Sequence, residues 1–472
     1  MNSGRVHGHR RWLIIVLVAF AICGLTAAGT LLATRGPEHN HAQTRRQPIQ
    51  KIILLSIDAL RADRLGCYGY HGAATSPTID AWAKQALLFD HAYSQAPWTV
   101  PSLASLMSGR YAREVGAYTN LDGDIRAQED TLPEQLHRLG YRTAFFNTNP
   151  LLMRPGIDRG FDSIAPPKTG NKIPYTSVEP LVMEWLDQHA RDKFFLWIHD
   201  MDTHSPPTEG NPYRGKPGWD RYDAEVRWVD EAVQRLRAKL DALGILDQVL
   251  FIFTADHGEA FGEHQLSGHQ DVIYDEVLRV PLIVQYPGMG RTGRVAAPVA
   301  LLDVNPTIGE LAGLPVTSVR RGESLVPLTA TTTANVRHSY VFSGRYYFGI
   351  DRIDPANGKV LIARGTHHLA VHDDEWKLIA KVYATISPPE QPDWDTTDPT
   401  KTSYELYDLT TDPLERYDLF AGQPEVAARL QRALAAWKGL TEGGYRAHSA
   451  PNITPVGIDP ATREALHSLG YD

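Results

Sequence analysis

Polar side chains that can bind a metal ion or move a proton follow four apolar, strand-like runs of the sequence. They are Asp58 after Ile52–Ile57, Asn147 and Asn149 after Arg142–Phe146, His199, Asp200, Asp202 and His204 after Phe194–Ile198, and Asp256 and His257 after Val249–Thr254. In an open parallel sheet, ligands bind outside the carboxyl ends of the strands. One acidic residue at a strand end often only caps the next helix. Four strands that deliver such side chains to one edge predict a functional site there.

Three of these residues have the chemistry of a metal site. Asp58, Asp256 and His257 offer carboxylate oxygen and imidazole nitrogen, which are ligands of hard and borderline divalent ions. We therefore predict that they form part of a site for one divalent ion, which is Ca²⁺, or alternatively Mn²⁺ or Zn²⁺.

The stretch Ala96–Arg110, APWTVPSLASLMSGR, offers an oxygen nucleophile. Pro101 suits the first turn of a helix, which places Thr99 at or just before the helix N-terminus. The free N–H groups and the dipole of such a terminus stabilise anions. The alternative is that Thr99 is only the N-cap and that Ser102 is only a hydroxyl of the first turn.

The elements that must position these residues define the fold class. A fifth apolar run, Pro281–Gln285, joins the four strands above, and helical patterns such as Pro77–Ala86 and Ala224–Leu243 lie between them. Near-continuous apolar strands that alternate with helices predict a largely parallel sheet covered on both faces. The fold class is therefore α/β.

Beyond about residue 345 the sequence changes to shorter segments with alternating polar residues. The expected strands are Lys359–Arg364, His368–His372 and Trp376–Ile379, and a helix is expected over Glu425–Gly439. This pattern predicts a small antiparallel sheet capped by a helix. A last helix is expected at Asp459–Tyr471.

The amino-terminal part of the chain predicts a membrane anchor. No charged residue occurs in the 22 positions from Trp12 to Ala33, and a helix needs about 20 apolar residues to cross a bilayer. Arg10 and Arg11 directly precede this run, which favours a cytoplasmic N-terminus and an extracytoplasmic body, periplasmic or at the cell surface. A cleaved signal peptide is the alternative, and it leaves the body in the same compartment.

The predicted organisation follows from these segments. It is a cytoplasmic N-terminus at residues 1–11, a transmembrane anchor at 12–34, a linker at 35–50, a catalytic domain at 51–345 and a C-terminal subdomain at 346–472.

Composition excludes several other classes of protein. A hydrophobic fraction of 43% and a charged fraction of 22% are ordinary globular values, which excludes a disordered chain. The net charge of −8 provides no basic surplus for phosphate contacts, so nucleic acid is not an expected partner. Cys23 and Cys67 are the two cysteines, which excludes a disulfide framework in the body.

Motifs in a fixed order resemble the sulfatase family of the alkaline phosphatase superfamily. They are SIDALRADRLGCYGY at 56–70, SPTIDAWA at 76–83, WTVPSLASLMSGR at 98–110, GYRTA at 140–144, HDMDTHSPP at 199–207, TADHGEAFGEH at 254–264, GHQDVIYDEVLRVPLIV at 268–284 and ELYDLTTDPLERYDL at 405–419. Any one motif is weak, whereas the ordered set is specific and covers about Lys51 to Leu419. The resemblance implies an alkaline-phosphatase-like fold.

The resemblance also implies roles for individual residues. The metal positions are Asp58, Thr99, Asp256 and His257, and the catalytic positions are Thr99 as the nucleophile with His204 and His269 at the leaving group. A metal at this place lowers the pKa of the nucleophile and neutralises the charge that develops during transfer.

The sequence departs from the family pattern at four places. Thr99 and Leu103 replace the convertible residue and the Arg of Cys/Ser-x-Pro-Ser-Arg, Ala59 replaces a second carboxylate, and Asn147–Pro150 replaces Gly-Lys-x-His. Threonine cannot become an aldehyde by the route that forms formylglycine, so no formylglycine is expected. Water or another acceptor must then open the covalent intermediate, which suits phosphorus better than sulfur.

Several functions fit this pattern. The leading hypothesis is a membrane-anchored, metal-dependent hydrolase that cleaves a sulfate or phosphate ester of a small molecule, glycan or lipid. A threonine nucleophile also resembles the phosphoglycerol and phosphoethanolamine transferases. It is similar as well to the nucleotide phosphodiesterases, whose second metal site would correspond here to Asp200, His204 and His269. A non-catalytic protein that binds a sulfated or phosphorylated glycan is the third hypothesis, against which the retained metal residues argue.

Overall fold

The computed structural model describes eleven stretches of the chain. They are residues 47–120, 123–165, 173–205, 207–269, 273–315, 320–330, 338–346, 349–353, 360–386, 392–393 and 400–446. The chain divides into two units, Met1–Gln47 and Pro48–Asp472. The predicted anchor at 12–34 and the predicted helix at 459–471 lie outside the described residues. Within the described stretches, none of the helices combines the length and the apolar composition that a membrane crossing requires.

An eight-stranded sheet forms the centre of the second unit, with the strand order β12-β2-β11-β7-β1-β6-β4-β5. Its strands are β1 (Lys51–Ile57), β2 (Leu87–Phe89), β4 (Arg142–Asn147), β5 (Ser163–Ala165), β6 (Phe194–Asp200), β7 (Val249–Ala255), β11 (Leu282–Gln285) and β12 (Gly293–Val295). The pairs within β7-β1-β6-β4-β5 are all parallel. The prediction of a mostly parallel sheet is therefore confirmed.

One strand departs from the parallel arrangement. β11 runs antiparallel to both of its neighbours, β7 and β2. A parallel crossover usually needs a dozen or more residues that include a helix. The described part of the segment between β7 and β11 contains a single short α-helix, the four-residue α8 (Asp275–Leu278). The sheet is therefore mixed at this position.

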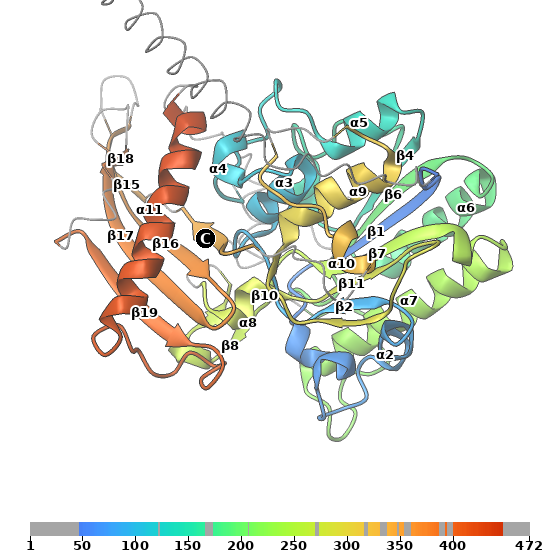
Figure 1. The fold of residues 1–472 in the computed structure, drawn as a ribbon. Coiled ribbons are helices and arrows are strands. Elements are labelled where there is room, and N and C mark those ends of the chain that lie inside the picture. Colours follow the sequence, from blue (N-terminus) through green and yellow to red (C-terminus); the bar gives the residue numbers. More distant parts are fainter. Residues whose placement is uncertain are drawn as a thin grey trace, which may run out of the picture. The chain divides into compact units, whose positions relative to one another are not determined.

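Helices cover both faces of the central sheet. Those on one side are α3 (Thr99–Ser108), α5 (Leu132–Arg138) and α9 (Val304–Ala312), and those on the other are α2 (Pro77–Ala83), α6 (Glu179–His189) and α7 (Arg221–Ala242) (Figure 1). β1, β6 and β7 are buried along almost their whole length. Two covered faces explain why these strands read as continuous apolar runs.

Short elements connect these layers. The helices are α4 (Ala112–Val115) and α10 (Val326–Ala330), and the strands are β3 (Ala92–Tyr93), β10 (Arg279–Val280) and β13 (Val299–Ala300) in one small sheet and β8 (Ala260–Phe261) and β9 (Ser267–Gly268) in another.

The carboxyl-terminal part forms a separate antiparallel sheet, as predicted. Its strands are β14 (Val341–Arg345), β15 (Gly349–Ile353), β16 (Val360–His372), β17 (Trp376–Ile386), β18 (Pro392–Asp393) and β19 (Thr402–Asp408). Two runs that we expected as separate strands form the single strand β16, which pairs with β17 over ten residues. Apolar residues of α11 (Pro424–Arg446), including Leu430, Leu434 and Trp437, pack on this sheet.

A buried ion cluster attaches this sheet to the catalytic part. The Lys377 ammonium lies 2.8 Å from carboxylate oxygens of both Asp275 and Glu415. Asp275 belongs to α8, whereas Lys377 and Glu415 belong to the carboxyl-terminal part. Because all three groups are desolvated, their charges must compensate one another, which constrains how the two sheets meet.

The strand register brings the predicted site residues to one edge. Ile57 of β1 pairs with Asp200 of β6 and with Ala255 of β7, and Asn147 of β4 pairs with His199. The carboxyl ends of four adjacent strands are therefore level, and the side chains that follow them converge.

Candidate active site

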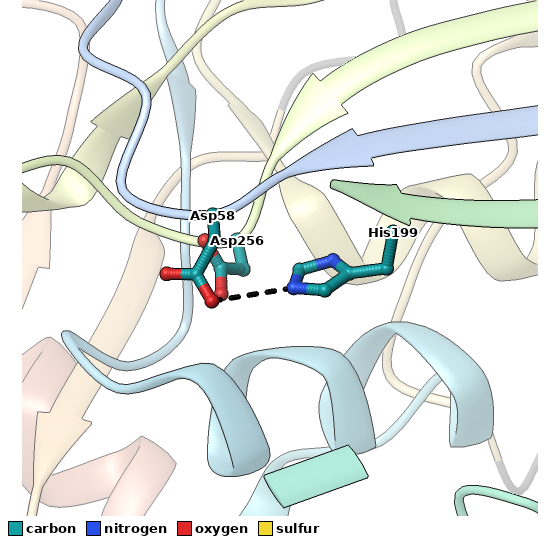
Figure 2. A group of neighbouring side chains, drawn as sticks. All are labelled: Asp58, His199 and Asp256. Carbon is teal, nitrogen blue, oxygen red and sulfur yellow. Dashed lines mark hydrogen bonds and ion pairs between the residues drawn. The ribbon is translucent and has the colours of Figure 1, made fainter. Parts of the chain in front are cut away.

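Two aspartates from adjacent strands lie together at this edge. Asp58 follows β1 and Asp256 follows β7, and both are fully buried. Figure 2 shows the two carboxylates side by side, with the ring of His199 from β6 directed at Asp58. Two adjacent buried carboxylates repel each other unless a proton or a cation lies between them.

Each carboxylate uses one oxygen to accept hydrogen bonds. Oδ1 of Asp256 accepts from the backbone N–H groups of Ala59 (3.1 Å) and His257 (2.8 Å). Oδ2 of Asp58 accepts from the Asn149 side chain (2.6 Å) and faces Nε2 of His199 (3.3 Å). The other two oxygens, Oδ1 of Asp58 and Oδ2 of Asp256, are buried with no hydrogen-bond partner among the described residues. Such atoms are those expected to bind a cation.

The backbone conformation of Ala59 directs its N–H group at the Asp256 carboxylate. Ala59 has φ = 57°, in the left-handed region that costs a non-glycine residue about 1–2 kcal/mol. This conformation accompanies the bond from its N–H to Asp256, and the Tyr222 hydroxyl donates to its carbonyl at 2.6 Å. Strained backbone of this kind is concentrated at functional sites.

The tautomer of His257 leaves a nitrogen lone pair directed at the carboxylates. Its Nδ1 lies 2.8 Å from the Gly258 carbonyl, an acceptor, so Nδ1 carries the proton. Nε2 then faces Asp256 Oδ2 at 3.6 Å and Asp58 Oδ1 at 3.8 Å. A neutral imidazole that donates through one nitrogen and presents the other is the usual form of a metal-bound histidine.

The predicted nucleophile lies beside this nitrogen. Thr99 is the first residue of α3, and its Oγ1 is 3.4 Å from Nε2 of His257. The next N–H group of the helix, that of Val100, donates to the Asn120 side chain at 2.9 Å. Thr99 is fully buried, so only a group held inside the site can reach its hydroxyl.

Two neighbours of Thr99 in α3 have structural roles. The Ser102 hydroxyl donates to the backbone carbonyl of Asp256 at 2.7 Å, which ties the helix to the end of β7. Leu103, at the position where the family pattern has Arg, is buried in the apolar core. The site consequently has no guanidinium at that position.

The two histidines predicted at the leaving group also reach the site. The rings of His204 and His269 are 5.2 Å apart between centroids, and His269 lies 4.3 Å from the ring of His257. Nδ1 of His204 donates to the Ser205 carbonyl. Burial lowers the pKa of His204 to about 4, although the negative charge of Asp58 opposes this effect. Glu259, also buried, lies 3.5 Å from Nδ1 of His269.

The two aspartates have opposite pKa shifts. Burial raises the pKa of Asp256 well above its usual range, and the charge of Asp58 adds to this effect. Burial also opposes ionisation of Asp58, but His204, His199 and His257 outweigh it and lower the pKa of Asp58. The metal-free pair therefore favours one proton between two carboxylates, and binding of a divalent cation releases that proton.

The cluster of ligand atoms in the described residues includes neither the residues of the alternative second metal site nor the predicted ligand His257. Asp200 directs its Oδ1 to the N–H of Asp202 (2.9 Å), and it does not join His204 and His269 in a cluster of ligand atoms there. The described cluster consists of Asp58, His199 and Asp256, whose ligand atoms lie within 4.8 Å of one another.

A cleft of about 610 Å³ opens next to His204. Its lining includes Arg64, Asp220, Tyr222, Glu225, Glu259 and Phe261. Phe261 is 41% exposed, so an apolar ring is available to a bound molecule at the surface. The cleft provides space for an organic molecule beside His204.

The fold and this site define a class, the α/β ester hydrolases of the alkaline phosphatase superfamily. Residues 50–314 match the family model described as Sulfatase, and residues 262–438 match a second model described as N-sulphoglucosamine sulphohydrolase, C-terminal. The first match covers more than half of the chain. The chain therefore belongs to the sulfatase family, whose members are hydrolases that act on sulfuric esters.

Individual relatives agree with this assignment. Arylsulfatase A of Homo sapiens is 26% identical over 487 residues, which cover 88% of this chain and 92% of the relative. A structure solved in complex with its substrate, D-glucosamine-2-N,6-O-disulfate, has a TM-score of 0.65 and 20% identity, and it covers 86% of this chain and 100% of that one. The phosphonate monoester hydrolase of Agrobacterium radiobacter has a TM-score of 0.64 and 18% identity, with 84% and 96% covered. These structures share the fold of this chain.

The buried group of Asp58, His199 and Asp256 is consistent with the Ca²⁺ site of a sulfatase.

Sequence reasoning left three residues of the site without a role. His199 and Asn149 were recognised as polar residues at strand ends, and Glu259 only as part of a motif. Their contacts with Asp58 and His269 depend on tertiary packing. The one available signal was their position at or shortly beyond the carboxyl ends of β4, β6 and β7.

Proposed function

We propose that this protein is a metal-dependent hydrolase that cleaves a sulfate or phosphate ester with Thr99 as the nucleophile. The observation that carries the proposal is the environment of Thr99 Oγ1. It lies at a helix N-terminus, 3.4 Å from a histidine nitrogen that also faces two carboxylate oxygens without hydrogen bonds. Asp58, Asp256 and His257 would hold the ion together with Thr99.

The residues of the chain define a balanced reaction. Burial lowers the pKa of His204 and His269, so one of them can take the proton of Thr99 Oγ1 as Oγ1 attacks sulfur or phosphorus. The bond to the leaving oxygen breaks, and the same histidine then donates that proton to the leaving oxygen. Water then attacks the transferred group, releases it as free acid and restores the Thr99 hydroxyl. A bound divalent ion would lower the pKa of the hydroxyl and neutralise charge on the transferred group.

Phosphorus is the alternative to the sulfuric ester of the family, and the residues around Thr99 support it. Threonine gives an intermediate that only attack on the transferred group can open. The cation positions of the family pattern are occupied here by Leu103, Thr148 and Pro150. The N–H of Val100 donates to Asn120 and Pro101 has none, so stabilisation of the anion falls mainly to the ion and to the dipole of α3.

A panel of esters tests the reaction class. Purified full-length protein is assayed on an aryl sulfate, an aryl phosphate monoester and an aryl phosphodiester, after chelation and after addition of Ca²⁺, Mn²⁺ or Zn²⁺. We expect turnover of at least one ester that chelator abolishes and metal restores. An added acceptor alcohol that diverts the product from free acid would instead indicate a transferase. Metal binding without turnover of any ester would overturn the hydrolase proposal.

The location of the protein is part of the proposal. The uncharged run at 12–34 and the preceding Arg10 and Arg11 support a single-pass anchor with the catalytic domain outside the cytoplasm. Protease added to spheroplasts, whose outer barrier is opened, is then expected to digest the body at residues 51–472. Full protection in spheroplasts with digestion only after lysis would exclude this orientation.

The substrate is proposed as a sulfated or phosphorylated small molecule, glycan or lipid. The aromatic and charged lining of the cleft beside His204 supports a bulky polar leaving group.

A further inference from the structure

Two side chains bind the same oxygen of Asp58. Asn149 Nδ2 donates to Oδ2 at 2.6 Å, and Nε2 of His199 lies 3.3 Å from it. The other oxygen, Oδ1, is 3.8 Å from Nε2 of His257 and has no hydrogen-bond partner in the described parts of the chain. Asp58, Asn149 and His199 are all fully buried, so water does not compete for these bonds. The carboxylate is therefore held with one oxygen toward the protein and the other toward His257.

The contacts of the two ring nitrogens of His199 indicate which of them carries the proton. The Trp197 indole, which can only donate, donates to Ser56 Oγ at 2.9 Å. Ser56 Oγ in turn lies 2.8 Å from Nδ1 of His199, but 3.4 Å from the Ile198 carbonyl. The carboxylate of Asp58 can only accept, so its 3.3 Å contact with Nε2 places the ring proton of His199 on Nε2, and the Ser56 hydroxyl then donates to Nδ1. Nε2 of His199 is then protonated and donates to Asp58.

We propose that His199 and Asn149 are positioning residues that hold Asp58 as a single-oxygen metal ligand, and that His199 is not itself a ligand. The proposal rests on the metal site of the proposed function. It assigns a role to Asn149, which lies in the segment that replaces Gly-Lys-x-His of the family pattern. The N–H groups of His199 and Asn149 thus orient the carboxylate.

This arrangement has a consequence for the choice of ion. A carboxylate whose second oxygen already accepts two hydrogen bonds cannot bind in a bidentate manner. Ca²⁺ takes six to eight oxygen ligands and often uses bidentate carboxylates, whereas smaller divalent ions take fewer. Both aspartates of the site are restricted in this way. The two hydrogen bonds to Oδ2 of Asp58 should therefore favour Mn²⁺ or Zn²⁺ over Ca²⁺.

Metal binding by the full-length protein tests the proposal directly. The affinity for Mn²⁺, and the Mn²⁺/Ca²⁺ ratio bound in competition, are measured by electron paramagnetic resonance of free Mn²⁺ in wild type, His199→Ala, Asn149→Ala and His199→Gln. We expect the two alanine variants to bind Mn²⁺ about 10–100-fold more weakly, as loss of residues that orient a ligand does. The glutamine amide N–H can replace the Nε2–H donor, so His199→Gln should recover most of the affinity.

Two results would overturn the proposal. If His199→Gln binds Mn²⁺ as weakly as His199→Ala, the imidazole is a ligand. If both alanine variants bind Mn²⁺ like wild type, the two hydrogen bonds position nothing. Ser56→Ala removes the hydroxyl behind His199 and is expected to weaken binding in the same direction, which provides a third variant if His199→Ala does not fold.

A matched control separates metal binding from stability. His338 is a partly buried histidine that bonds Asp303 at 2.7 Å outside the site, and His338→Ala must leave the Mn²⁺ affinity unchanged. The melting temperature of each metal-free variant reports on folding. Mn²⁺ binding that follows these expectations without turnover of any ester would contradict the proposed hydrolase and leave the positioning roles intact.

Discussion

Replacing Thr99 with Ala should lower kcat by at least about 10³-fold, because loss of a nucleophile removes the covalent route altogether. The hydroxyl makes one described side-chain contact, to His257 at 3.4 Å, so its loss should cost only about 1 kcal/mol of unfolding free energy. The measurement is kcat on the best ester of the panel, together with the urea unfolding midpoint of the same preparation.

Two further variants at this position sharpen the result. Thr99→Val keeps the shape of the side chain without the hydroxyl and should be as inactive as Thr99→Ala. Thr99→Ser keeps the hydroxyl and should retain measurable turnover. The assignment of Thr99 fails if the alanine and valine variants turn over the ester at the wild-type rate.

The second large effect is expected at Asp256. Asp256→Asn preserves the oxygen that accepts from Ala59 and His257 and replaces the other, Oδ2, with an amide nitrogen. An amide nitrogen is not a metal ligand, so bound metal should fall to less than about a tenth and kcat/KM by at least about 10²-fold. Metal content by mass spectrometry of the dialysed protein and initial rates measure both.

Without metal, Asp256→Asn should be more stable than wild type, although it binds metal and cleaves the ester less well. Burial and the charge of Asp58 both raise the pKa of Asp256, so at neutral pH the metal-free protein must take up a proton when it folds. Asn needs no such proton, and the substitution should therefore raise the metal-free melting temperature. Asp230→Asn is the matched control, because Asp230 is also buried and accepts from two backbone N–H groups, those of Thr78 and Ile79. Full metal content in Asp256→Asn would remove Asp256 from the ligand set.

Much of the fold followed from local patterns. The runs at β1, β6 and β7 are apolar along their length because helices cover both faces of the sheet, and this signal is readable without coordinates. The antiparallel direction of β11 was not readable, because an apolar run of four residues carries no information about its direction. The continuity of β16 was missed because its pattern of polar residues is interrupted.

The sequence by itself determined the family, the class of chemistry and the positions of Asp58, Thr99, Asp256 and His257, because motif order and strand ends are local properties of the chain. Only the tertiary structure decided which oxygen of each aspartate is engaged and that Asn149 and His199 reach Asp58. Asn149 is 91 residues from Asp58 and His199 is 141 residues away. Contacts over such separations depend on strand order and register, which side-chain spacing along the chain does not encode.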